Sequence, residues 1–380
     1  MRIVRIVAVQ AFVAFALLEI VLRIYNPMPF RMRGTHLVLP VHQRYEFRHE
    51  GSRHLDKVTY HSKNALGFRG PDPPRDLAGR LSIITIGGST TECLFLSDGD
   101  TWTDELARRL ARLRPDIWVN NAGFDGQSTF GHLLLLRDVI VPLKPKIAVF
   151  LVGINDVAIE AQNEYDRSMM ASWVPWRERW NVYDTRLVAR RTPWHDEWAF
   201  LTDHSEIFGL VENVRRMRRA RSMNFSGAEW ELTGQPQLVL SPAVLDARLA
   251  RLGPALDGYT SRLREIIQIT RSNGIVPVFV TQPLLVGDAT VVDLVTHVNL
   301  GDVQLRPGDN GEFEWRRVEL YNDVTRRVAA ESKVTLVELA HALPKDSRLF
   351  YDFLHYTREG AARVGDILAD ALEPIAGRTQ

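Results

Sequence analysis

An α/β fold with a mainly parallel sheet is predicted by two patterns in the sequence. The candidate strands are short, continuously apolar runs, such as residues 81–86 and 147–152. Runs of this kind are typical of strands that are buried on both faces. They alternate with segments of helical periodicity, and this alternation is typical of parallel strands joined by helices. The sequence therefore predicts a sheet that is covered by helices on both faces.

The expected elements follow one another from residue 81 onward. The first strand closes on Gly87-Gly88, and a helix-compatible segment then runs to Leu113 with Trp102, Leu106 and Leu110 on one face. A long amphipathic helix ends at Asn273-Gly274, a plausible C-cap. The expected strands are residues 81–86, 117–120, 147–152, 276–280 and 334–339, and the later helices are residues 243–272, 313–331 and 361–372.

The alternation lapses between about residues 157 and 241, which indicates an insertion into the α/β domain. Tryptophan is concentrated there, at Trp173, Trp176, Trp180, Trp194 and Trp198. These side chains form either a small core of the insertion or a ligand contact, and the usual burial of tryptophan favours the core. An arginine-rich run follows at residues 215–221. A solvated helix face is favoured there over a site for a polyanion or for lipid headgroups.

The first 25 residues predict a membrane anchor. Residues 6–22 are apolar apart from Gln10 and Glu19, and Arg5 and Arg23 at the two ends extend the usable span to about 20 residues. A cleaved signal peptide is one alternative, but the apolar pattern continues beyond the small residues at which cleavage would fall. A buried core helix is the other. The flanking arginines mildly favour the orientation that keeps the following domain in the cytoplasm.

Residues 26–80 predict a linker and an irregular extension, because they are rich in Arg, His, Pro and Gly and show little periodicity. The α/β domain itself is expected at residues 81–376.

Composition excludes several classes of function. The 47 basic and 46 acidic residues nearly cancel, so no overall field draws the chain onto nucleic acid. Cys93 is the single cysteine, which excludes an internal disulfide and a cysteine-based zinc site. The hydrophobic share of 45% and the charged share of 24% exclude a disordered or fibrous chain.

Ser89 is the first candidate for chemistry. It follows Gly87-Gly88 at the carboxyl end of the first strand, where α/β proteins bind their ligands, and it begins a helix whose N-terminus favours negative charge. The alternative is a simple helix cap. The segment is not a P-loop, a dinucleotide-binding turn or the G-x-S-x-G elbow. Cys93 is a rival nucleophile, although a lone cysteine is more often a small buried hydrophobe.

Three further segments follow expected strands or precede the last helix. A glycine of residues 121–126 can present a backbone N–H to an oxyanion, and the Asn155 carboxamide can donate a hydrogen bond to a tetrahedral intermediate. Asp352 lies three residues before His355, so one tight turn can bring its carboxylate to the imidazole and fix the tautomer. Taken singly, each segment also fits an ordinary turn or a surface pair.

In this chain order the four segments resemble the SGNH hydrolase family, often called GDSL esterases or lipases. Its four blocks supply Ser, Gly, Asn and His, with an Asp three residues before the His. The resemblance implies that Ser89 is the nucleophile, His355 the general base and Asp352 the residue that orients it. It also implies an oxyanion hole made of the Ser89 N–H, the Gly126 N–H and the Asn155 side chain, with no metal or organic cofactor.

The resemblance covers about residues 81–160 and 275–372 and implies a flavodoxin-like three-layer α/β/α sandwich. The first block reads Gly-Gly-Ser-Thr where the family has Gly-Asp-Ser-Leu, which indicates a subgroup. With the N-terminal anchor and the stretch at residues 64–70, the chain looks like the membrane-tethered bacterial branch of the family. In that branch the catalytic domain lies outside the cytoplasmic membrane, so we expect a periplasmic domain despite the arginine count.

The function implied is a serine esterase that hydrolyses small acyl esters, such as acetyl esters, on a cell-envelope glycan or lipid. Two alternatives remain open. An O-acyltransferase would pass the acyl group from Ser89 to a sugar hydroxyl instead of water, and the choice depends on the shape and dryness of the pocket. A non-catalytic envelope protein would keep the fold for binding alone.

Overall fold

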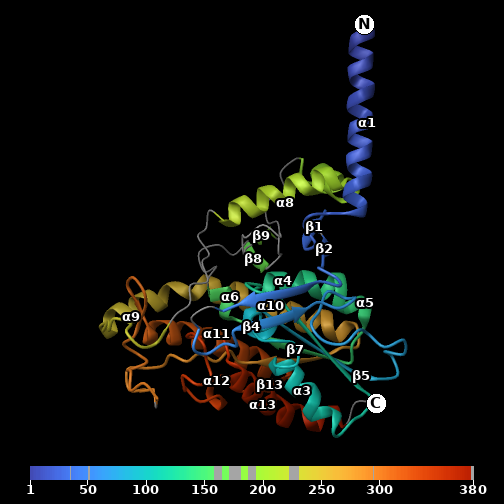
Figure 1. The fold of residues 1–380 in the computed structure, drawn as a ribbon. Helices are drawn as coiled ribbons and strands as arrows, with labels where there is room; N and C mark the ends of the chain where they lie inside the picture. The colour runs from blue at the N-terminus through green and yellow to red at the C-terminus, as the bar shows by residue number, and fades with distance from the viewer. Residues whose placement is uncertain are drawn as a thin grey trace.

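In a computed structural model of the chain, a five-stranded parallel sheet forms the centre of the molecule (Figure 1). The structure describes residues 1–34, 36–49, 52–157, 165–170, 181–186, 194–221, 231–293 and 295–377. The strands lie in the order β13-β10-β7-β5-β6, and each neighbouring pair is parallel. Their bounds are Leu81–Gly87 (β5), Ile117–Gly123 (β6), Ile147–Leu151 (β7), Val276–Val280 (β10) and Thr335–Val337 (β13). This is the flavodoxin-like strand order.

The strands are apolar because helices cover both faces of the sheet. Every residue of β5 and β7 is buried. Helices α3 (Trp102–Ala111) and α13 (Arg358–Ala376) pack together over one face, while α10 (Gly253–Ser272) packs against α4 (Thr129–Leu135) and α11 (Gly311–Ser332) over the other. The helices lie on both faces because the connections between parallel strands are right-handed. The chain moves from β5 outward to β6 and then back past β5 to β7, so the connecting helices lie on opposite faces of the sheet. The predicted α/β fold class is confirmed.

Short elements join the main ones. They are α2 (Ser89–Glu92), the π-helix η1 (Leu136–Ile140), α5 (Val141–Leu143), α6 (Ile154–Val157), α9 (Pro242–Leu249), the 3₁₀-helix η2 (Ala250–Leu252), α12 (Leu339–Ala342) and the hairpin of β11 (Gln304–Arg306) and β12 (Asp309–Asn310).

Three expected elements differ from the structure. The segment expected to be helical up to Leu113 is divided into α2 and α3, because the left-handed conformation of Cys93 (φ +51°) ends α2 and the side chain of Thr101 caps a new helix at Trp102. The helix expected over residues 243–272 is divided into α9 and α10, with η2 between them, because Pro254 stands in the first turn of α10. A proline has no N–H to donate, and its ring would clash with the carbonyl four residues earlier in a continuous helix. The strand expected over residues 334–339 is shorter, since Leu339 already begins α12.

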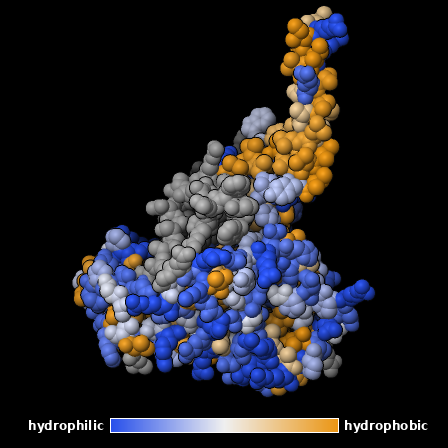
Figure 2. Space-filling view, viewed as in Figure 1, coloured by the Kyte–Doolittle hydropathy of each residue, from blue (hydrophilic) through white to orange (hydrophobic). Residues whose placement is uncertain are grey.

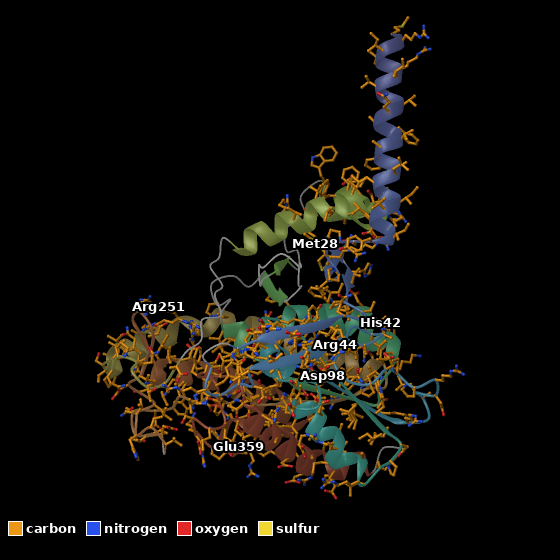
Figure 3. The ribbon with its side chains drawn as sticks, in the orientation of Figure 1. Met28, His42, Arg44, Asp98, Arg251 and Glu359 are labelled. Atoms are coloured by element: carbon orange, nitrogen blue, oxygen red, sulfur yellow. The ribbon has the colours of Figure 1, made fainter. Side chains whose placement is uncertain are left out.

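The first helix, α1 (Arg2–Ile24), projects away from the domain, and its side chains extend outward from it on all sides (Figures 1 and 3). In the part of the chain that the structure describes, it is the one helix long and apolar enough to cross a membrane. Its Leu22 is buried, whereas most of its other side chains are exposed. Such exposure is incompatible with the alternative of a core helix.

Residues 26–80 form two antiparallel hairpins where the sequence predicted an irregular extension. They are β1 (Arg31–Arg33) with β2 (His36–Val38), and β3 (Arg44–Arg48) with β4 (Val58–Ser62). The segment packs against the α/β domain: Phe30 stacks on Phe124 at 5.5 Å between ring centroids, and buried Arg69 donates to the carbonyls of Glu92 and Cys93. Strands of three to five residues are too short for their alternation to stand out in the sequence.

The insertion contributes helices α7 (His195–His204) and α8 (Glu206–Arg221), together with the hairpin of β8 (Tyr165–Met170) and β9 (Asn181–Arg186). Trp173, Trp176 and Trp180 lie outside the described residues. Trp198 donates to Glu212 of α8 at 3.1 Å, so this tryptophan has a structural contact. The arginine-rich run falls in the last turns of α8, where Arg215 pairs with Glu212.

Candidate active site

The candidate site lies at the carboxyl ends of the strands, at the point where the strand order reverses. β5 comes first in the chain and lies between β6 and β7. Folds of this order bind their ligands beyond the strands at which the connections diverge. Ser89 follows β5, Gly126 follows β6 and Asn155 follows β7, so the topology brings the three predicted segments to one edge of the sheet.

Ser89 is the first residue of the short helix α2 and is buried. Gly88 before it is held close to Asn155: a Cβ atom at Gly88 would lie 2.1 Å from the Asn155 Nδ2 atom. Only a glycine fits there without displacing the carboxamide. The sequence Gly-Gly-Ser therefore has a steric reason, because it lets the loop after β7 approach the start of α2.

Asp352 and His355 meet Ser89 from the other end of the chain. The Nε2 atom of His355 lies 2.8 Å from the Ser89 Oγ atom, and the Nδ1 atom lies 2.6 Å from an Asp352 carboxylate oxygen. The second Asp352 oxygen accepts hydrogen bonds from the backbone N–H groups of Leu354 and His355 at 2.8 and 2.7 Å. One aspartate thus builds the turn that carries the histidine and also orients its ring.

The charges around His355 favour its protonated form. Burial by itself lowers the pKa of the imidazole, but the charge and hydrogen bond of Asp352, together with the charge of Asp125, outweigh it and raise that pKa above its ordinary value of 6.5. An imidazole with a raised pKa is a stronger base once it is neutral, and its imidazolium form is stabilised where it stands.

The three groups expected to face an oxyanion lie around Ser89. Gly126 has a φ of +72°, a conformation that favours glycine. The Asn155 Nδ2 atom donates to the Gln127 carbonyl at 3.1 Å, which holds the carboxamide beside Gly88. The structure therefore brings all five predicted site residues to one edge of the sheet.

Asp125 is a neighbour of the site that sequence reasoning missed. Its buried carboxyl group forms hydrogen bonds with the Ser89 side chain and the Gly126 N–H. Burial, followed by the negative charge of Glu92, raises the pKa of Asp125 to about 7 although those two hydrogen bonds and His355 oppose the rise.

Glu92 connects Asp125 to the N-terminal hairpins. It accepts a hydrogen bond from the Asp125 N–H at 2.6 Å and pairs with buried Lys63 at 2.6 Å. Lys63 follows β4, so residues from the expected extension support the loop behind Ser89. Only the identity of Asp125, directly before the predicted Gly126, could have drawn attention to it in the sequence.

Tyr351 is a second residue that the sequence analysis missed. Its ring stacks on the His355 imidazole, with centroids 5.4 Å apart and planes 8° from parallel. Its N–H also donates to the His355 carbonyl at 2.9 Å. The stack restrains one face of the imidazole ring, whereas Asp352 holds its Nδ1 edge.

Two residues near the predicted motifs have structural contacts instead. Cys93 is buried, burial raises the pKa of its thiol to about 12, and its Sγ atom lies against the Thr90 carbonyl. A thiol that stays protonated is a poor nucleophile. Asp156, next to Asn155, accepts hydrogen bonds from Thr129 and pairs with Arg262 at 3.1 Å.

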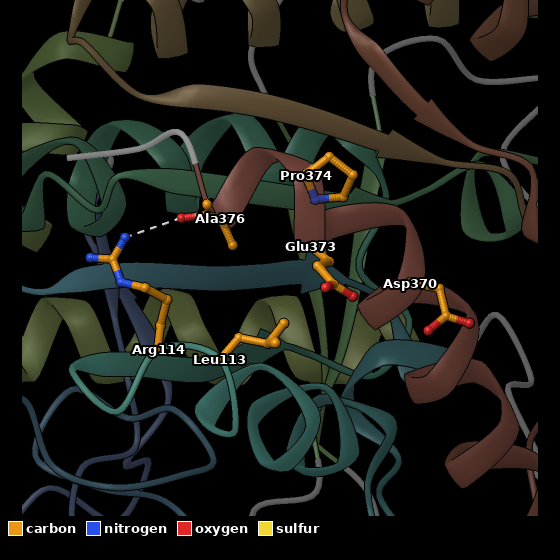
Figure 4. A pocket seen from close by; sticks show the side chains of 7 residues that line it. Leu113, Arg114, Asp370, Glu373, Pro374 and Ala376 are labelled. Carbon is orange, nitrogen blue, oxygen red and sulfur yellow. Dashed lines mark hydrogen bonds between the residues drawn. The ribbon is translucent and has the colours of Figure 1, made fainter.

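Within the described ranges, no cluster of three or more His, Cys, Asp or Glu side chains is placed to hold a metal ion. A shallow hollow of about 480 Å³ lies between the ends of α3 and α13 (Figure 4). Leu113 and Arg114, which line it, precede β6, so the hollow is at the edge of the sheet opposite Ser89.

A doubly wound α/β sheet that carries a Ser–His–Asp arrangement at its switch point defines the class of serine hydrolases. The chain belongs to the GDSL-like lipase/acylhydrolase family, whose model matches residues 85–363. It is therefore an SGNH-type serine hydrolase of acyl esters. The match begins within β5, so α1 and the N-terminal hairpins lie outside it.

Solved structures of low sequence identity are similar to the chain. The acetylxylan esterase Axe2 from Geobacillus stearothermophilus is 15% identical, with 79% of this chain and 94% of that chain covered and a TM-score of 0.41. The α/β hydrolase LAE5 from the metagenome of Lake Arreo, Spain, is 14% identical, with 79% and 96% covered and a TM-score of 0.40. TesA is 16% identical, with 77% and 99% covered and a TM-score of 0.40. No curated protein matches the chain.

Proposed function

We propose that the enzyme hydrolyses an acyl ester through a covalent acyl-enzyme intermediate, with Ser89, His355 and Asp352 as its catalytic triad. The distance of 2.8 Å between Ser89 Oγ and His355 Nε2 carries this proposal. His355 accepts the Ser89 proton as the oxygen attacks the ester carbonyl, then returns that proton to the leaving alcohol. The same imidazole next deprotonates a water molecule, which attacks the acyl group. The imidazolium then returns the proton to the Ser89 oxygen as the acid is released.

The tetrahedral intermediates carry their negative charge beside the start of α2. The Ser89 N–H, the Gly126 N–H and the Asn155 carboxamide are the donors proposed to bind it. In comparable sites, each such donor lowers the activation barrier by about 3 kcal/mol. Asp125 lies beside Ser89 and Gly126 at this place.

We also propose where the enzyme acts. α1 is an uncleaved anchor in the cytoplasmic membrane, and the catalytic domain lies on the periplasmic side. The length and apolar composition of α1 support the anchor. The substrates proposed for this location are small acyl esters of an envelope glycan or lipid.

Covalent labelling with a fluorophosphonate tests the activated serine. We expect the mass of the folded protein to rise by one phosphonyl group in the wild type and to stay unchanged in Ser89→Ala. The matched control is Ser261→Ala, since Ser261 is an exposed serine of α10 that donates to the Asp257 carbonyl. A folded wild type that takes no label would contradict the proposal.

A further inference from the structure

The helices α7 and α8 expose apolar side chains at the base of α1. Trp194, Phe200, Leu201 and Val211, here called the outer face, have exposed fractions of 75%, 60%, 39% and 54%. In Figure 2 the hydrophobic surface of α1 continues without a break onto these helices. Exposed apolar surface that is continuous over several elements marks a contact with another molecule or with a membrane.

Specific contacts fix α8 to α1. Glu19 of α1 accepts hydrogen bonds from the Ser205 hydroxyl at 2.9 Å and from two backbone N–H groups at the start of α8 at 2.9 and 3.2 Å. These N–H groups have no partner within their own helix, so Glu19 acts as the cap of α8. Arg23 pairs with Glu19 at 3.0 Å and donates to the His204 carbonyl at 2.7 Å.

These contacts also set the level of α8 along α1. Glu19 lies inside the apolar run of residues 6–22, and exposed Ile20 and Val21 come after it. Phe208 of α8 packs against Phe15, which is one turn further into the run, at 6.1 Å between ring centroids. When residues 6–22 lie in a bilayer, the start of α8 therefore lies level with the last turns of the span, in the interfacial layer.

The orientation of α8 turns Val211 of the outer face away from the catalytic domain. Asn213 faces that domain, because its side chain bonds to the backbone N–H and carbonyl of Met32 in β1 at 2.9 and 2.8 Å. Val211 lies two residues earlier, about 200° around the helix, and so points to the opposite side. In Figure 1, α8 runs sideways from the base of α1, on the side of the domain from which α1 projects.

We infer that the outer face lies against the lipid of the same bilayer that α1 crosses. This inference rests on the proposed anchoring role of α1. Tryptophan and phenylalanine side chains suit the membrane interface, and a helix with one apolar face lies in the interfacial plane. Glu197 and His204 are also exposed on α7, which suits the headgroup layer and not the hydrocarbon. The helices α7 and α8 then hold the catalytic domain at a fixed height and orientation.

Fluorescence quenching in vesicles tests the inference with the full chain. Val211→Cys, Val13→Cys and Val239→Cys are each made in a Cys93→Ala background, labelled with an NBD fluorophore and reconstituted into phosphatidylcholine–phosphatidylglycerol vesicles. Val239 is 77% exposed and lies outside the insertion helices, so it reports on water. We expect doxyl lipids to quench the labels at residues 211 and 13, and aqueous iodide to quench the label at residue 239 at least fivefold more steeply than that at 211.

The possible results separate the proposals. Iodide quenching at residue 211 equal to that at residue 239 would overturn the inference, while lipid quenching at residue 13 would still support the anchor. Protection of residue 211 from both quenchers would also overturn it, because a protein would then cover the outer face. A label at residue 13 that reports water would overturn both the anchor and the inference. Fluorophosphonate labelling of the same samples reports on fold and on the proposed chemistry independently.

Discussion

At the scale of single residues, His355 lies between two carboxyl groups of different character. Asp352 orients the imidazole through Nδ1, whereas Asp125 contacts the serine that the imidazole activates. Both negative charges raise the pKa of His355 against the effect of its burial. Asp125, whose own pKa is about 7, changes its charge in the pH range in which the enzyme is proposed to work.

The pH profile of ester hydrolysis should report this arrangement. Neutral His355 is the active form, so activity is present above its pKa and is lost as the pH falls through it. Because that pKa is raised, the loss is expected to begin above pH 6.5. Asp125→Asn removes a charge that raises the pKa of His355, so the acidic limb should move to lower pH. The measurement is kcat/KM from pH 5 to 9, and an unshifted limb would contradict the role given to Asp125.

Gly88 should tolerate no side chain. In Gly88→Ala the new Cβ would meet the Asn155 Nδ2 atom at 2.1 Å, so the carboxamide must move. Loss of one oxyanion donor lowers kcat by about 10²- to 10³-fold. Gly253→Ala is the matched control, since nothing lies within 4 Å of a Cβ atom there. Equal kcat values for the two variants, measured on a small chromogenic ester, would argue against a role for Asn155.

At the scale of elements, the buried guanidinium of Arg262 links the segment after β7 to α10, a helix that covers the sheet. Arg262 of α10 donates to Thr129 at 2.6 Å and to Asp156 at 3.1 Å, and its guanidinium stacks over Phe130 at 4.0 Å from the ring centroid. Thr129 also donates to Asp156. The residue beside Asn155 is thereby fixed from α4 and α10 together.

Removal of that cation should destabilise the domain. Arg262→Ala leaves the buried Asp156 carboxylate without its charge partner, which costs about 3 to 5 kcal/mol of unfolding free energy. Arg264→Ala, on the same helix, removes an exposed pair with Glu331 and should cost about 1 kcal/mol or less. Urea unfolding of the two variants is the measurement. A smaller loss in Arg262→Ala than in Arg264→Ala would contradict the structural role.

At the scale of the whole molecule, the catalytic domain, the insertion helices and α1 are connected in series. The sheet carries the site at its carboxyl edge, α8 contacts β1 on the domain side, and Glu19 of α1 caps α8. The helices α7 and α8 therefore link the domain to α1. If α1 is the proposed anchor, the orientation of the site relative to the membrane follows from contacts of α8 with α1 and β1, two elements that lie outside the family match.

The anchor should fail when a charge is placed at its middle. Val13 lies near the centre of residues 6–22, where a lysine costs about 2.5 to 3.5 kcal/mol of insertion free energy. Val13→Lys should increase the fraction of full-length protein that alkaline carbonate releases from membranes. Val239→Lys, at an exposed position of the domain, is the control. Equal release of both variants would show that α1 does not span the bilayer.

Local patterns in the sequence were enough to predict part of this protein. Continuously apolar runs predicted the five parallel strands. A strand that is covered on both faces buries every one of its side chains, so each of its residues tends to be apolar. The site residues Ser89, Gly126, Asn155, Asp352 and His355 were assigned through the resemblance of four ordered segments to the SGNH family, since each segment alone also fits an ordinary turn or surface pair.

Other features depend on contacts between residues that are far apart in the sequence, and these became visible in the folded structure. The contact of Asp125 with Ser89, the stack of Tyr351 on His355 and the cap that Glu19 provides for α8 leave no periodic signal. The two N-terminal hairpins were missed because their strands are too short to show an alternation. Pairing partners separated by long stretches of chain are selected by packing, and packing is a property of the folded molecule and not of any window of its sequence.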